Sequence, residues 1–152
     1  MDTEKKNKTV IIIAGPTASG KTSVAIELAK YFKTEIISAD SRQCFEELNI
    51  GVARPSEEEL KTVKHHFIAS HSIHENISAG TFEDFALQKV NELFETHDVV
   101  IMAGGTGLYI KAFCEPSLRR AFGARKIGCP SFRFTSERMA ENLRRKVIFA
   151  DK

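Results

Sequence analysis

The sequence predicts an α/β fold, an open parallel sheet with helices on both of its faces. Short apolar runs at residues 10–14, 35–39 and 98–103 alternate with segments whose apolar residues recur every three or four positions. The last of these runs has no polar alternation, as expected for a parallel strand that is covered on both faces. Strands that alternate with helices in this way form a doubly wound sheet.

The first strand is followed by a loop with the pattern G-x-x-x-x-G-K-[ST] and then by a helical pattern at residues 23–31. Strand, loop and helix in this order form a phosphate site, and they make the predicted fold similar to that of the P-loop NTPases. Gly15 and Gly20 allow the backbone to turn tightly and point its N–H groups inward, where the helix adds its positive end. The predicted phosphate-binding residues are Gly15, Pro16, Thr17, Ala18, Ser19, Gly20, Lys21 and Thr22.

Two side chains of this loop have expected roles of their own. Lys21 is expected to hold the outer phosphates as a positive charge, and Thr22 is expected to offer its hydroxyl to Mg²⁺. The alternative is a glycine-rich turn that holds no ligand. The strand and the helix that flank the loop favour the phosphate site, so the sequence predicts a protein that binds a polyphosphate.

The remaining elements follow from capping patterns and periodicity. The pattern Ser56-x-x-Glu59 is a capping box, which predicts a short helix to about Val63. An apolar stripe with three- and four-residue steps predicts a longer helix over residues 82–97. The other expected elements are helical turns at 44–48, a loop at 49–55, a strand at 65–70, a turn at 78–81 and a helix at 108–113.

Polar loops follow three of the predicted strands, at residues 15–22, 40–43 and 104–106. Parallel strands end on the same side of a sheet, so these loops are expected to converge there. Asp40 is the carboxylate among them. It is expected either to help hold Mg²⁺ through water or to act as a general base that faces the phosphate leaving group. A structural role as a helix N-cap is the alternative.

An ordered set of motifs resembles the N-terminal half of the tRNA dimethylallyltransferases, or tRNA isopentenyltransferases, of the IPP transferase family. The resemblance covers about residues 9–115, and no motif of the family is recognised after Cys114. The motifs are Gly-Pro-Thr-Ala-Ser-Gly-Lys-Thr (15–22), Ser-Ala-Asp-Ser-Arg-Gln (38–43), Ile-Gly-Val-Ala-Arg-Pro (50–55), His-His (65–66), Ser-Ala-Gly (78–80) and Gly-Gly-Thr-Gly-Leu-Tyr (104–109).

The resemblance implies an enzyme that transfers a dimethylallyl group from dimethylallyl diphosphate to N6 of an adenine beside the tRNA anticodon. The glycine loop, Lys21 and Mg²⁺ would then stabilise the charge on the leaving diphosphate. Asp40 would accept the proton of the adenine amine, and Thr106 would contact diphosphate or substrate from the opposite side. The catalytic residues implied are Asp40, Thr106 and Lys21, and the tRNA contacts implied are Asp40, Ser41, Arg42, Gln43, Arg54 and Thr106.

Two regions of different charge divide the chain. Residues 1–115 are predicted to form the catalytic core, and residues 116–152 form a basic tail that is partly helical, at about 136–147. The tail has ten Lys and Arg but three Asp and Glu, which is consistent with a large polyanion as a partner and equally with a solvated basic helix face. Full members of the family are about twice as long, so the tail is expected to be a truncated or incomplete remainder of a larger architecture.

Other functions remain open at this level. The first is transfer of the same group to a free adenine nucleotide, as in adenylate isopentenyltransferases. The second is a small-molecule kinase that uses ATP, and the third is a truncated remnant that binds without catalysis. No apolar run approaches the roughly 20 residues of a membrane helix, so we expect a cytoplasmic protein. We also expect a monomer.

Overall fold

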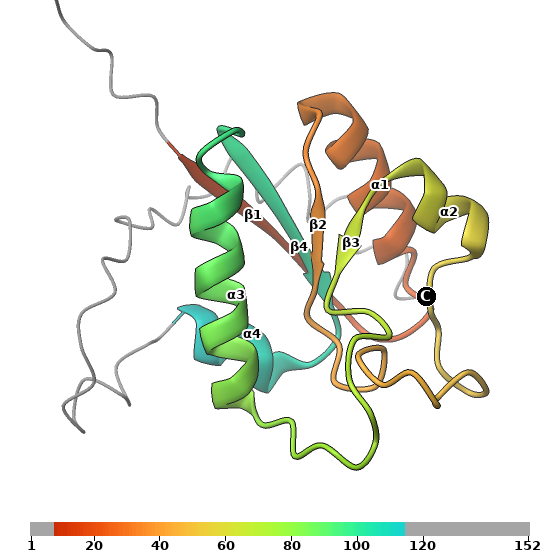
Figure 1. Ribbon diagram of the computed structural model, residues 1–152. Helices are drawn as coiled ribbons and strands as arrows, with labels where there is room; N and C mark the ends of the chain where they lie inside the picture. The colour runs from red at the N-terminus through yellow and green to blue at the C-terminus, as the bar shows by residue number, and fades with distance from the viewer. Residues whose placement is uncertain (1–7, 115–152) are drawn as a thin grey trace, which may run out of the picture.

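The computed structural model describes residues 8–114, and all structural statements below concern that part of the chain. Figure 1 shows its strands and helices in alternation along the chain. They are β1 (Thr9–Ala14), α1 (Lys21–Phe32), β2 (Ile36–Ser38), α2 (Glu57–Thr62), β3 (His65–His66), α3 (Ala79–Leu93), β4 (Val99–Gly104) and α4 (Gly107–Cys114).

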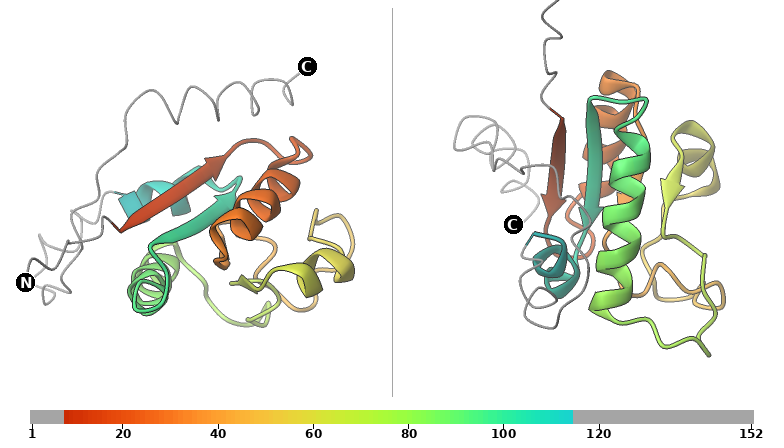
Figure 2. Two further views of the ribbon diagram at one scale, coloured as in Figure 1. Left: turned by 90° about the horizontal axis from the view of Figure 1, so that it is seen from above. Right: turned by 60° about the vertical axis from the view of Figure 1, so that its left-hand side comes forward.

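The four described strands form one parallel sheet in the order β1-β4-β2-β3. Its central strand, β4, pairs with β1 along its whole length and with β2 at Ile101, Met102 and Ala103. Figures 1 and 2 show α1 and α3 on opposite faces of this sheet, with α4 beside α3. The predicted α/β class, a parallel sheet with helices on both faces, is confirmed.

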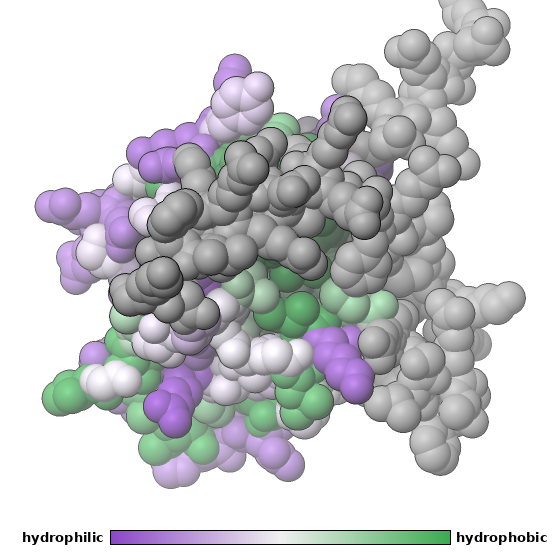
Figure 3. All heavy atoms as spheres, turned by 180° about the vertical axis from the view of Figure 1, so that it is seen from behind, coloured by the Kyte–Doolittle hydropathy of each residue, from purple (hydrophilic) through white to green (hydrophobic). Residues whose placement is uncertain are grey.

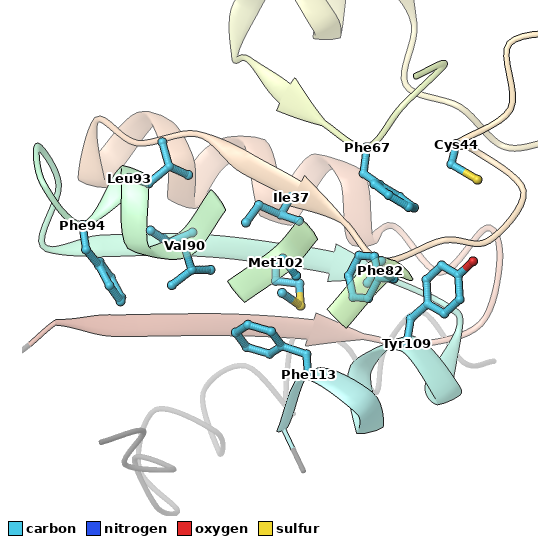
Figure 4. Packing of buried hydrophobic residues seen from close by; sticks show 13 residues of the cluster. Ile37, Cys44, Phe67, Phe82, Val90, Leu93, Phe94, Met102, Tyr109 and Phe113 are labelled. Atoms are coloured by element: carbon cyan, nitrogen blue, oxygen red, sulfur yellow. The ribbon is translucent and has the colours of Figure 1, made fainter. Parts of the chain in front are cut away.

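Each face of the sheet has its own apolar core. On the α1 side, Ile11, Ile13 and Ile101 pack with the alanines and Ile26 of α1. On the other side, α3 and α4 supply large aromatic side chains (Figure 4). Phe82 stacks on Tyr109 at 4.6 Å between ring centroids, and Phe67 meets Phe82 edge-on at 5.2 Å. The stripe predicted for residues 82–97 is therefore core packing, which fixes the position of the loops above it.

Three predicted elements differ from the structure. Residues 44–48 form turns and a single bridge between Phe45 and His71, where helical turns were expected. The strand expected at 65–70 ends at His66, because Phe67 and Ala69 have φ angles of 64° and 45°, which no strand allows. Helix α3 begins at Ala79, earlier than expected, because Ser78 and Thr81 form a capping box.

Two further findings concern the basic tail and the length of the described helices. The basic tail at 116–152 and its expected helix lie outside the described residues. None of the described helices combines the length and the apolar character that crossing a bilayer requires.

On the face opposite to that of Figure 1, apolar residues gather toward the centre of the view and hydrophilic residues project at the left (Figure 3).

Candidate functional site

The three predicted polar loops meet at the carboxyl edge of the sheet. The Thr106 N–H donates to the Ala39 carbonyl at 3.2 Å, and the Ser41 N–H donates to Thr106 Oγ1 at 2.9 Å. Gly104 is required for this approach, since a Cβ there would lie 2.2 Å from the Ala39 carbonyl oxygen. The convergence predicted from the sequence is thus confirmed, and it depends on a glycine at the end of β4.

The loop at residues 15–22 presents backbone N–H groups at the start of α1. Gly20 is the N-cap of that helix, with φ 77°, and it has no side chain to satisfy the first N–H groups. Ala18 also lies in the left-handed region, at φ 62°. The first turn of α1 contains no acidic residue, so nothing there competes for the positive end of the helix. The local structure is that of an anion-binding site.

The Lys21 ammonium lies against its own loop. Its Nζ donates to the Pro16 carbonyl and, at 3.3 Å, to Ser19 Oγ. Burial lowers the pKa of Lys21, and the negative charge of Asp40 opposes that shift. Within the described residues Lys21 forms no ion pair, so its charge remains available to an anion that reaches the loop.

Asp40 follows β2 and uses one oxygen to hold the turn that comes next. Its Oδ1 accepts the N–H groups of Arg42 at 2.9 Å and of Gln43 at 3.3 Å. No described residue donates a hydrogen bond to Oδ2. No helix begins here, so Asp40 is not the helix N-cap that was the alternative; it holds a turn instead, and that role occupies one oxygen. The other oxygen is free to accept a proton or to bind a hydrated cation.

Gln43 and Arg54 tie the loop at 49–55 to the sheet. Gln43 Oε1 accepts the Ser38 hydroxyl at 3.0 Å, and its Nε2 donates to the Ala53 carbonyl at 2.6 Å. Arg54 donates to Asn49 Oδ1 at 2.7 Å and to the Phe45 carbonyl, while its buried Nε has no partner in the described chain. Both side chains are thus already bonded within the protein, and their predicted contacts with tRNA stay predictions.

A cavity of about 290 Å³ opens between α1 and the segment that carries α2 and β3. Asp40, Gln43 and Arg54 line it together with most of the phosphate loop. Ser41, Arg42 and Thr106 do not. The Thr106 hydroxyl also donates to Ser41 Oγ at 3.3 Å, so it braces the turn after Asp40. The predicted residues that line the cavity are Thr17, Ala18, Ser19, Gly20, Lys21, Thr22, Asp40, Gln43 and Arg54.

Other residues of the cavity were not assigned to the site from the sequence. Ser38, Glu59, His65 and Ile68 all line it. Ser38 could have been found from the sequence. Side chains two residues apart on a strand point to the same face, and Ser38 lies two residues before Asp40. No pattern marks Ile68, because its side-chain direction depends on the left-handed residues that flank it.

The residues suit a magnesium ion that is held partly by a substrate. Thr22 lies in the first turn of α1 and lines the cavity, and its hydroxyl has no hydrogen-bond partner among residues 8–114. The described chain has no group of three His, Cys, Asp or Glu residues that could hold a metal by itself. One hydroxyl and the free oxygen of Asp40 match the few protein ligands that Mg²⁺ takes beside phosphates and water.

Comparison with known proteins adds an independent finding. The family model described as IPP transferase matches residues 43–149. The match begins at Gln43, after the phosphate loop and Asp40, and it continues beyond Cys114, where the recognised motifs end. It covers well over half of the chain.

Individual relatives agree with the family model. The chain is 56% identical over 105 residues to a tRNA dimethylallyltransferase of Flavobacterium johnsoniae, covering 69% of this chain and 34% of that protein. A full-length tRNA isopentenylpyrophosphate transferase from Bacillus halodurans superposes with a TM-score of 0.68 at 34% identity, covering 82% of this chain and 40% of that one. A tRNA delta(2)-isopentenylpyrophosphate transferase from Staphylococcus epidermidis gives 0.65 at 39% identity, covering 71% and 35%. The chain spans about a third of the length of the curated relatives that it matches.

Proposed function

This chain belongs to the IPP transferase family, and we propose that it transfers a dimethylallyl group from dimethylallyl diphosphate to N6 of an adenine beside the tRNA anticodon. One observation carries the proposal. Lys21 and the N-terminus of α1 line the same cavity as Asp40, whose Oδ2 accepts no hydrogen bond from the described residues. An anion-binding end and a proton acceptor therefore face one space, which is the pairing that this transfer requires.

The reaction breaks the bond between the allylic carbon and the diphosphate oxygen, and it forms a bond between that carbon and N6. The electron pair of the broken bond leaves with diphosphate, where the loop N–H groups and Lys21 stabilise the added charge. The N6 proton passes to Asp40, whose other oxygen is held by Arg42 and Gln43. That anchoring keeps the accepting oxygen in place without occupying it.

Mg²⁺ bound near Thr22 would supply positive charge to the diphosphate as it leaves. On the protein side, the Thr22 hydroxyl is the group that would hold it, while Asp40 Oδ2 stays available for the proton. The acceptor reaches this site as an unstacked base, which an anticodon loop provides more readily than a duplex does. Ser41, Arg42 and Thr106 lie beside Asp40 and do not line the cavity, so a contact that they make with diphosphate or tRNA would be made at its rim.

The test offers the 152-residue chain radiolabelled dimethylallyl diphosphate with either unmodified tRNA or AMP. Label transferred to tRNA supports the proposal. Label transferred to AMP alone would assign the chain to the adenylate enzymes. Donor binding without transfer to either acceptor would show a binding remnant.

Asp40→Asn separates the two roles of Asp40. The amide oxygen can still accept from Arg42 and Gln43, but the side chain no longer takes a proton. We expect single-turnover transfer to slow by about 10²–10⁴-fold while diphosphate affinity, measured by calorimetry, stays unchanged. Glu46→Gln, at an exposed carboxylate six residues later, is the control. An equal loss of donor affinity in Asp40→Asn would place Asp40 in metal binding instead.

A further inference from the structure

Ile68 occupies an unusual position in the cavity. It is half-buried and lines the cavity, yet it belongs to neither apolar core of the sheet. An isoleucine that packs on neither core contributes less to folding than a core isoleucine does. Its apolar surface faces the space where a ligand would lie.

The backbone around Ile68 is held in a costly conformation. Phe67 and Ala69 on either side have φ angles of 64° and 45°, which residues other than glycine seldom adopt. The Phe67 ring is fixed in the aromatic core by Phe82 and Phe85, with centroids 5.2 and 4.9 Å away. Such backbone strain persists where the surrounding structure imposes it, and it often occurs at functional sites. Here its result is that Ile68 points toward the cavity.

The backbone directly after Ile68 is hydrogen-bonded to the turn that follows Asp40. The Ala69 N–H donates to the Gln43 carbonyl at 2.9 Å, and the Ser70 N–H donates to the Cys44 carbonyl at 2.9 Å. The Gln43 side chain holds Ala53 at the same time. Gln43 is therefore hydrogen-bonded both to Ala53 and to Ala69, the neighbour of Ile68. Ala53, Pro55 and Ile68 all line the cavity, and we call these three residues the apolar wall.

We propose that the apolar wall binds the five-carbon tail of the donor and that Ile68 sets the longest prenyl chain that the site accepts. The inference rests on the proposed function. The donor has a charged end and a short branched hydrocarbon end, and the cavity offers both chemistries within about 290 Å³. A fixed wall would also keep water away from the allylic carbon as its positive charge grows.

The test measures binding and does not require turnover. Three probes are titrated into the 152-residue chain by calorimetry: inorganic diphosphate, dimethylallyl S-thiolodiphosphate and geranyl S-thiolodiphosphate. The sulfur-bridged analogues have the same tails but do not ionise readily. In the unaltered chain, we expect the dimethylallyl probe to bind more tightly than both of the others.

Two substitutions change the wall in opposite directions. Ile68→Ala makes room, so the affinity for the geranyl probe relative to the dimethylallyl probe should rise about tenfold or more. Ile68→Phe fills the space, so the dimethylallyl affinity should fall about tenfold while the diphosphate affinity stays the same. The matched control is Ile73→Ala, at an isoleucine of the same loop that is 49% exposed and does not line the cavity.

The outcomes separate the two proposals. If inorganic diphosphate fails to bind the unaltered chain, the phosphate site and the proposed function are wrong. If diphosphate binds but the dimethylallyl tail adds no affinity, or if the ratio of the two tails is the same in all Ile68 variants, the apolar wall is overturned. Loss of diphosphate binding in both Ile68 variants would show a structural role and would also overturn it.

Discussion

The two edges of the same sheet treat their charged groups in opposite ways. At the amino edge, charges are paired with one another. Glu35 accepts from His66 and lies 3.6 Å from Lys64, and Lys8 lies 3.0 Å from Asp98. Burial alone would raise the pKa of Glu35, but the His66 hydrogen bond and the nearby positive charges bring it below its usual range.

At the carboxyl edge, several polar groups lack a hydrogen-bond or ion-pair partner among the described residues. Lys21 has no carboxylate partner within the described chain, Asp40 keeps one oxygen free, and Gly20 leaves the first N–H groups of α1 without a side-chain cap. Unpaired groups of this kind lower stability unless a ligand satisfies them. The amino edge therefore stabilises the sheet, whereas the carboxyl edge leaves polar groups that only a ligand or solvent can satisfy.

The largest expected effect comes from breaking the carboxyl edge itself. In Gly104→Ala the new methyl group would lie 2.2 Å from the Ala39 carbonyl oxygen, so β4 and β2 must move apart where the loops converge. We expect a loss of at least about 3 kcal/mol in the free energy of unfolding, measured in urea by circular dichroism.

Gly107→Ala is the matched control for that substitution. A Cβ at this position meets nothing within 4 Å, and the residue begins helix α4. Alanine is favoured over glycine in helices by up to about 1 kcal/mol, so this variant should be as stable as the original or more stable. Equal destabilisation by both variants would contradict the close packing assigned to Gly104.

A smaller effect is expected when the unpaired charge of the carboxyl edge is removed. Lys21→Ala should weaken the binding of inorganic diphosphate by about 10- to 100-fold, since a hydrogen bond to a charged group contributes about 1.5–3 kcal/mol. Unfolding stability should change little, because Lys21 pairs with no carboxylate in residues 8–114. Lys30→Ala, in the last turn of the same helix, is the control and should leave the affinity unchanged. A Lys21 variant with full affinity would remove Lys21 from the phosphate site.

The smallest expected effect comes from removing a charge at the amino edge, where the charged groups are paired. The folded pKa of Glu35 lies below its ordinary value of 4.5, so its contribution to stability is complete above that pH and is lost as the pH falls through the folded pKa. Glu35→Gln should therefore cost about 1 kcal/mol near pH 7 and less at pH 3. Urea titrations across that range measure the difference. A constant difference between the two proteins would show that the pair does not depend on the Glu35 charge.

Much of the architecture could be predicted from local patterns. The phosphate loop lies between a strand and a helix, the capping box at Ser56 opens α2, and Asp98 precedes the buried strand β4. These features follow from hydrogen-bonding and burial rules that act within a few residues of each other. The rule that parallel strands end together was sufficient to place Asp40 beside the phosphate loop.

The roles of Gln43, Arg54 and Ile68 required the tertiary structure. Gln43 donates to the Ala53 carbonyl, and Arg54 donates to Asn49 and to the Phe45 carbonyl, so polarity alone could not separate a structural hydrogen bond from a nucleic-acid contact. The short length of β3 also results from contacts between distant segments. The sequence predicts a strand over residues 65–70, but packing of Phe67 against α3 accompanies left-handed backbone at Phe67 and Ala69, and Ile68 lines the cavity. Local sequence determined which elements form, and contacts between distant segments decided which side chains face the site.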